Sequence, residues 1–142
     1  VHWDEVLWIE RRTRAEYDMW KARVQGGADA IEFEAPAPGY TGRGVRGHVM
    51  EGIYAQHPDF AANDFKKAPI AIHDGSPDGH GSNTYGQVFG SGKGNREARG
   101  ILPNAQGLYT NASDFSSGKA SRYDLVMSLV KNQGVMFQTA SW

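Results

Sequence analysis

The stretch SRYDLVMSLVKNQGVMFQTA, residues 121–140, decides the fold class. Ser121 can cap a helix over residues 122–132, because serine is among the residues preferred at that position. The apolar residues are spaced four apart, as on one face of a helix: Leu125 with Leu129, and Val126 with Val130. Gly134 stands where many helices end in a left-handed residue, and residues 135–140 have the composition of a strand. The stretch therefore predicts a helix followed directly by a strand.

Upstream segments show the same alternation of strands and helices. Residues 44–50, 69–73 and 107–110 have the short β-branched and apolar character of strands, and residues 82–89 predict a short helix. Strands separated by helices favour a parallel sheet that is covered on both faces. We therefore expect an α/β fold, a three-layer sandwich with a mainly parallel sheet.

The first part of the chain has a different composition. Residues 13–25 predict a helix with a capping box at its start. Residues 35–42 are rich in proline and glycine, and each residue before a proline is disfavoured in the helical region. We therefore expect an N-terminal helix and an extended approach segment in residues 1–41, and the main domain in residues 42–142.

Composition and charge exclude several classes of partner. The chain has 142 residues with 15 basic and 16 acidic side chains, and its formal net charge is −1. This charge gives no cationic surface for a nucleic acid or an anionic membrane, and no apolar stretch approaches the length of a bilayer span. The absence of cysteine excludes disulfides, zinc–cysteine sites and thiol catalysis. We expect no nucleic-acid partner and no membrane partner.

The hydrophobic content is low for a complete domain. Leu, Ile, Val and Phe together make up 26 of the 142 residues, which predicts a thin core. A strand at residues 135–140 also needs another element to cover its far edge. We therefore expect the chain to end in the middle of a fold.

Four segments contain the residues that could take part in catalysis. His80 lies in GHGSNTYG, residues 79–86, where small neighbours allow close approach to the imidazole, although the segment by itself also fits a solvated histidine. Residues 42–53 read GRGVRGHVMEGI, residues 57–60 read HPDF, and residues 100–105 read GILPNA. Together and in this order, the four segments resemble those of the subtilisin-like serine peptidases.

The resemblance covers about residues 42–142 and implies a function. It implies acyl transfer to water through a serine whose proton is taken by a histidine, while a carboxylate holds the tautomer of the imidazole. His80 would be the general base and acid. The nucleophilic serine and the oxyanion asparagine would lie beyond Trp142, on the remaining C-terminal part of the same protease. The substrate would be a peptide or protein, and the protein would be secreted.

The catalytic acid departs from the family pattern. Where the family has Asp-Ser-Gly or Asp-Thr-Gly, this chain has Met50, Glu51 and Gly52. An alignment without a gap from His57 places Met50 at the acid position, whereas a gap of one residue places Glu51 there. We choose Glu51 as the acid, and the alternative is an ordinary carboxylate at a strand end. The extra methylene of glutamate must then be accommodated by the strand or the histidine.

Two further segments resemble substrate-binding elements of the family. Ser117, Gly118 and Lys119 resemble the edge segment that pairs with the substrate backbone, and the alternative is a simple loop. Ser141 and Trp142 resemble the start of the strand beside the primary specificity pocket, where Trp142 would wall the pocket or serve as a core residue. These five residues are the predicted substrate-binding set.

Two other classes of function remain open at this point. One is a catalytically inactive relative that binds peptides or has a structural role. The other is a nucleotide-binding α/β domain, suggested only by GSGKG at residues 90–94, which lacks the serine or threonine that should follow the lysine of a phosphate loop. Asp59 could assist a structural calcium site as in some relatives, but a lone carboxylate is no metal site. We therefore predict no metal and no cofactor.

Overall fold

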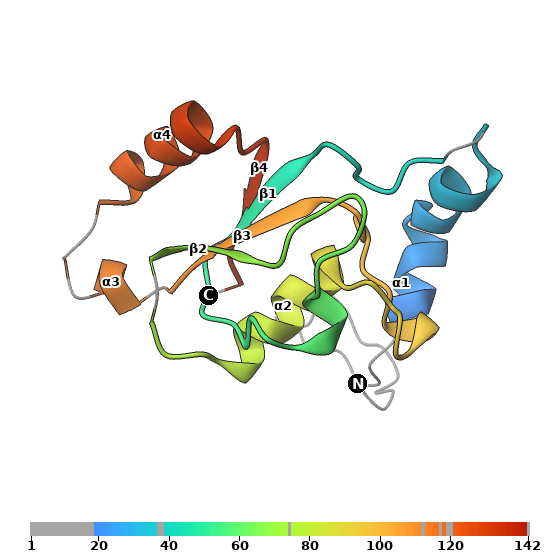
Figure 1. Ribbon diagram of the computed structural model, residues 1–142, viewed down its shortest axis with the longest axis horizontal. Helices are drawn as coiled ribbons and strands as arrows, with labels where there is room; N and C mark the ends of the chain where they lie inside the picture. Colours follow the sequence, from blue (N-terminus) through green and yellow to red (C-terminus); the bar gives the residue numbers. More distant parts are fainter. Residues whose placement is uncertain are drawn as a thin grey trace, which may run out of the picture.

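A parallel sheet forms the centre of the described part of the protein (Figure 1). The computed structural model describes residues 19–36, 39–73, 75–111, 113–116, 118 and 121–141. Within them the strands are β1 (Arg46–Val49), β2 (Ile70–His73), β3 (Gln106–Thr110) and β4 (Phe137–Thr139), in the spatial order β2-β3-β1-β4. All three pairings of neighbouring strands are parallel. The predicted α/β class with a mainly parallel sheet is therefore confirmed.

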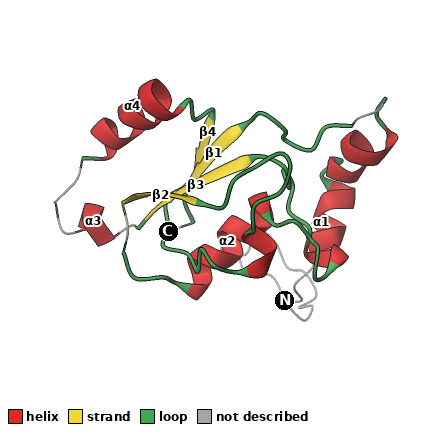
Figure 2. Cartoon of the chain, in the orientation of Figure 1, coloured by secondary structure: helices red, strands yellow, loops and turns green. Residues whose placement is uncertain are grey.

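Helical elements alternate with these strands along the chain (Figure 2). They are α1 (Met19–Gln25), η1 (Ala30–Glu34), η2 (Pro58–Phe60), α2 (Gly79–Phe89), η3 (Arg96–Ala98), α3 (Ser113–Ser116) and α4 (Arg122–Gln133). The helix predicted at residues 13–25 is present from Met19 onward, and its first six residues lie outside the described part of the chain. No helix in the described residues is both long and apolar enough to cross a membrane.

The helix–strand unit of residues 121–140 is confirmed in its main features. Ser121 caps α4, since its hydroxyl accepts the backbone N–H of Asp124 at 3.3 Å. Gly134 ends the helix in the left-handed conformation, with φ of 61°. The strand is shorter than predicted, because only Phe137–Thr139 pairs with β1.

Helices cover both faces of the sheet. Leu108 in β3 is fully buried and packs in a cluster with Leu125 and Leu129 of α4. The next residue, Tyr109, packs in a second cluster with residues of α2. Because consecutive strand residues point to opposite faces, α4 and α2 lie on opposite sides of the sheet, as Figure 1 also shows.

Tyr85 of α2 shows how a large side chain fits this interface. Its side chain is large, yet Tyr85 is only 2% exposed in the structure. A Cβ atom added to Gly107 of β3 would lie 2.0 Å from the Tyr85 hydroxyl. The ring thus occupies the space that a side chain at residue 107 would need, so that helix and sheet still pack closely.

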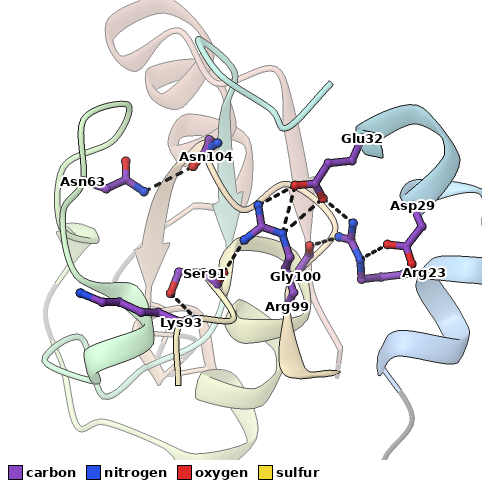
Figure 3. Close-up of polar contacts among 9 residues, drawn as sticks. All are labelled: Arg23, Asp29, Glu32, Asn63, Ser91, Lys93, Arg99, Gly100 and Asn104. Carbon is purple, nitrogen blue, oxygen red and sulfur yellow. Dashed lines mark hydrogen bonds and ion pairs between the residues drawn. The ribbon is translucent and has the colours of Figure 1, made fainter. Parts of the chain in front are cut away.

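A buried ionic network attaches residues 19–36 to the rest of the protein (Figure 3). Arg23 of α1 is 2% exposed and pairs with Glu32 and with Asp29. Arg99 pairs with the other carboxylate oxygen of Glu32 at 2.5 Å. Arg23 also donates to the backbone carbonyl of Gly100. The N-terminal elements are therefore docked on the segment that follows the carboxyl end of α2.

Candidate active site

Glu51 and His80 form a hydrogen-bonded pair where β1 ends and α2 begins. The Nδ1 atom of His80 lies 2.6 Å from Oε2 of Glu51. The imidazole is 59% exposed, whereas the Glu51 side chain is only 4% exposed. The proximity expected from the sequence is thus present in the structure, while the catalytic role of the pair stays a prediction.

The structure brings only one of the two candidate acid residues to the imidazole. Met50 is 3% exposed and packs in the cluster that contains Leu125 and Leu129, on the α4 face of the sheet. Glu51, the next residue, contacts His80 of α2 on the other side. The alignment with a one-residue gap therefore matches the geometry, and Met50 lies away from the imidazole.

One glycine, Gly81, allows β1 and α2 to meet this closely. A Cβ atom on Gly81 would lie 2.1 Å from the carbonyl oxygen of Gly52 and 2.7 Å from Cβ of Glu51. Only glycine therefore permits the first turn of α2 to rest on the end of β1. The close backbone approach brings the imidazole within reach of Glu51, whose side chain is one methylene longer than that of an aspartate.

Asp78 fixes the start of the helix that carries His80. Its carboxylate accepts the backbone N–H groups of His80 and Gly81 at 3.2 and 3.4 Å, the arrangement of an N-cap. The predicted helix over residues 82–89 therefore starts earlier, at Gly79. The cap places His80 in the first turn of α2, where the side chain is open to solvent.

Both oxygens of the Glu51 carboxylate have partners. Oε1 accepts the backbone N–H of Ser141 at 3.0 Å, and the Thr84 hydroxyl lies 3.5 Å from Oε2. These two contacts were not expected from the sequence. Thr84 stands four residues after His80 and hence on the same helix face, which is a signal that could have found it. The Ser141 amide follows β4, and its position depends on strand order.

Asn111 joins three segments beside the pair. Its amide Nδ2 donates to the Ser76 carbonyl at 2.7 Å, in the loop that leads to α2. Cβ atoms on Gly52 and Gly75 would lie 2.9 and 2.6 Å from the same nitrogen. The end of β3 thus supports both the end of β1 and the loop before His80.

This geometry sets the chemistry that the imidazole can perform. A carboxylate accepts but cannot donate, so the proton between the two groups belongs to Nδ1 and Nε2 is left as the base. Nε2 has no hydrogen-bond partner in the described part of the chain, and no serine hydroxyl there is bonded to the ring. The pair is therefore arranged to take a proton from a group that approaches Nε2.

A metal centre fits the same residues less well. Atoms of Glu51, Asp78 and His80 lie within 4.8 Å of one another. Two ligands of one tetrahedral zinc ion stand about 3.3 Å apart, given bond lengths near 2 Å. The 2.6 Å contact between His80 and Glu51 is too short for both atoms to bind one ion as they stand. Asp78 is also engaged by the backbone of α2.

The predicted substrate-binding set is only partly described. Ser117, Lys119 and Trp142 lie outside the described residues. Gly118 is in a left-handed conformation with φ of 69°, and its N–H donates to the Phe115 carbonyl. Ser141 contacts the acid through its backbone. The role of this set in substrate binding therefore stays a prediction.

The glycine-rich loop at residues 90–94 lacks the features of a phosphate-binding loop. It follows the carboxyl end of α2, whereas a phosphate loop opens a helix. Oδ1 of Asp59 accepts the hydroxyl of Ser91 at 2.6 Å and the N–H of Lys93 at 3.2 Å. The Asp59 carboxylate thus already accepts the Ser91 and Lys93 donors that a phosphate would need. This arrangement argues against the nucleotide-binding hypothesis.

Comparison with known proteins gives no independent assignment. No protein-family model matches the chain, and no curated protein matches it. The case for a function therefore depends on the geometry around Glu51 and His80.

Proposed function

We propose that this chain is the N-terminal part of the catalytic domain of a subtilisin-like serine endopeptidase. His80 is the general base and acid, and Glu51 orients it. The nucleophilic serine lies beyond residue 142. The observation that supports this proposal most is the contact between a buried carboxylate and an exposed imidazole at 2.6 Å.

Each residue of the pair has a defined part in the reaction. Glu51 accepts the Nδ1 proton, which leaves Nε2 to take the proton of the serine hydroxyl as its oxygen attacks the scissile carbonyl carbon. The imidazolium that forms is stabilised by the carboxylate. It then gives its proton to the leaving amine, and a water molecule repeats the cycle to release the acyl group.

The arrangement of elements also supports the proposal. The acid follows the end of a central parallel strand, and the histidine opens the next long helix, in the chain order of the family that the motifs resemble. The segments at residues 42–53 and 100–105, two parts of that resemblance, are in contact: a Cβ atom on Gly42 would lie 2.9 Å from Cβ of Leu102 and of Ala105. We propose that the described sheet is one half of a three-layer sandwich of this type.

The test uses the full-length protein and a fluorophosphonate, which acylates activated serines. We expect labelling of one serine downstream of residue 142. His80→Ala should abolish labelling and lower peptide hydrolysis by about 10⁴-fold or more, since the base is lost. Glu51→Gln should lower the rate strongly but less completely. Lys131→Gln changes an exposed residue of α4, on the opposite face of the sheet from α2, and should leave both readouts unchanged.

Two outcomes would contradict the proposal. If His80→Ala is labelled and cleaves peptides like the parent, the histidine is not the base. If the parent protein neither reacts with the fluorophosphonate nor cleaves peptides, the inactive peptide-binding module is the better description of the chain.

A further inference from the structure

A second concave site lies at the opposite end of the sheet from Glu51. A cavity of about 550 Å³ is lined by the first residues of three strands, Arg46, Ile70 and Gln106, and by the loop of residues 63–67. Its volume is within the range of about 300 to 1,000 Å³ that holds small ligands. Because Glu51 lies two residues beyond Val49, the last residue of β1, the cavity and the candidate active site are separate.

The charged residues of this cavity are mainly cationic. Arg46, Lys66 and Lys67 line it together with one acid, Asp64. Lys66 is already engaged, because its ammonium donates to the Phe89 carbonyl at 2.5 Å and the residue is 6% exposed. Arg46 and Lys67 therefore provide the charge that a ligand can reach.

Arg46 has an incomplete set of partners. Its Nη2 donates to Oε1 of Gln133 at 3.1 Å, a neutral group. Its Nε is buried without any hydrogen-bond partner, and no carboxylate of the described residues pairs with this guanidinium. Arginine stays charged, and a buried donor without an acceptor costs free energy. A bound anion would supply a counter-charge for this guanidinium.

Phe65 adds an apolar wall to the same cavity. Its side chain is 46% exposed, and the guanidinium of Arg43 lies 4.8 Å from its ring centroid. An aromatic ring with a flanking cation suits a ligand that combines an apolar body with a negative group. Inorganic anions would use only the cationic part of this lining.

We propose that this cavity binds a small organic carboxylate, whose carboxylate pairs with Arg46 and whose apolar part packs on Phe65. The planar guanidinium matches a carboxylate in shape and charge. The site is independent of the peptidase proposal, because it shares no residue with the Glu51–His80 pair.

Benzoate is the probe, and binding to the ¹⁵N-labelled full-length protein is followed by amide chemical shifts. We expect saturable shifts concentrated in residues 63–67 and at Gln106, with a dissociation constant in the millimolar range. Arg46→Gln should weaken binding at least about tenfold, which corresponds to about 1.4 kcal/mol. Phe65→Ala, at an exposed position, should weaken it several-fold. Lys131→Gln removes the same charge from α4 and should bind like the parent.

The controls make the result decisive. An unchanged amide spectrum outside the cavity shows that the Arg46 variant is folded, and Phe65→Ala tests the site if that variant is not. The proposal is overturned if benzoate causes no saturable shift, or if the Arg46 and Phe65 variants bind like the parent. Equal weakening by Lys131→Gln would indicate general attraction to positive charge and would also overturn it.

Discussion

At the scale of single residues, the site depends on a glycine as much as on its two titratable groups. His80 reaches Glu51 because the first turn of α2 rests on the backbone of Gly52. A side chain at Gly81 would meet that backbone at 2.1 Å. Backbone cannot move aside as a flexible side chain can, so the contact between helix and strand would open.

We therefore expect Gly81→Ala to lower both the rate of peptide hydrolysis and the free energy of unfolding. We expect destabilisation of about 3 kcal/mol. A shift of the imidazole by about 1 Å would lower peptide hydrolysis roughly 10²-fold. Gly79→Ala is the matched control, because nothing lies within 4 Å of a Cβ at that residue of the same helix. Chemical denaturation and peptide hydrolysis by the full-length protein measure both effects, and equal behaviour of the two variants would contradict the account.

Part of the candidate site could be predicted from the sequence and part could not, for a physical reason. His80 and Glu51 were identified because they belong to local motifs in a fixed chain order. The contact from Ser141 to Glu51 spans 90 residues and depends on β4 pairing with β1. A backbone amide has no residue signature, so only the folded sheet reveals this partner.

At the scale of elements, local patterns predicted helices and strands well where caps and apolar spacing agree. Residues 121–140 are the clearest example. The short π-helix at Ala30–Glu34 was not predicted. Its Glu32 is held by Arg23 of the neighbouring helix α1 and by Arg99, which lies 67 residues further along the chain. The attachment of this element therefore depends on long-range ionic contacts, which periodicity in sequence does not show.

The ionic network predicts how the N-terminal elements can be released. Glu32→Gln leaves Arg23 and Arg99 without their shared carboxylate, and the loss of one partner of a buried pair costs about 3 to 5 kcal/mol. We expect faster hydrogen exchange in residues 19–36, with less change in the sheet. Glu34→Gln, an exposed glutamate of the same helix, should exchange like the parent. Unchanged protection of residues 19–36 in Glu32→Gln would refute a clamping role.

At the scale of the whole molecule, one buried histidine connects three strands. His48 of β1 is fully buried, and its Nε2 lies 2.8 Å from the Thr110 hydroxyl of β3. Its Nδ1 lies 3.0 Å from the side-chain amide nitrogen of Gln138 in β4. Burial lowers the pKa of His48 from 6.5 to about 4, so the ring is neutral in the folded protein at neutral pH.

The buried neutral state of His48 makes the free energy of unfolding depend on pH. Between about pH 6.5 and pH 4 the unfolded chain binds a proton that the folded protein excludes, so the free energy of unfolding falls as the pH is lowered through this window. The loss from this residue amounts to roughly 3 kcal/mol. Urea unfolding as a function of pH should therefore show a smaller acid-induced loss for His48→Asn than for the parent. Identical losses would mean that His48 does not control this transition.

The global fold was predictable to the level of class. Alternation of strands and helices predicted the parallel sheet, and the sheet is present in the described residues. The strand order and the packing of Tyr85 on Gly107 were not predicted, because they arise from contacts between segments distant in sequence. Local pattern specifies elements, whereas their arrangement depends on how side chains fill the space between them.

The tautomer of His80 tests the central claim most directly. In alkaline buffer, ¹⁵N shifts of the neutral imidazole should show the proton on Nδ1, held by Glu51, and a bare Nε2. His48 provides an internal reference of opposite type, because Gln138 donates to its Nδ1 and its proton is on Nε2. Glu51→Gln should turn His80 into a mixture of tautomers. A parent protein in which Nε2 of His80 carries the proton would contradict the account.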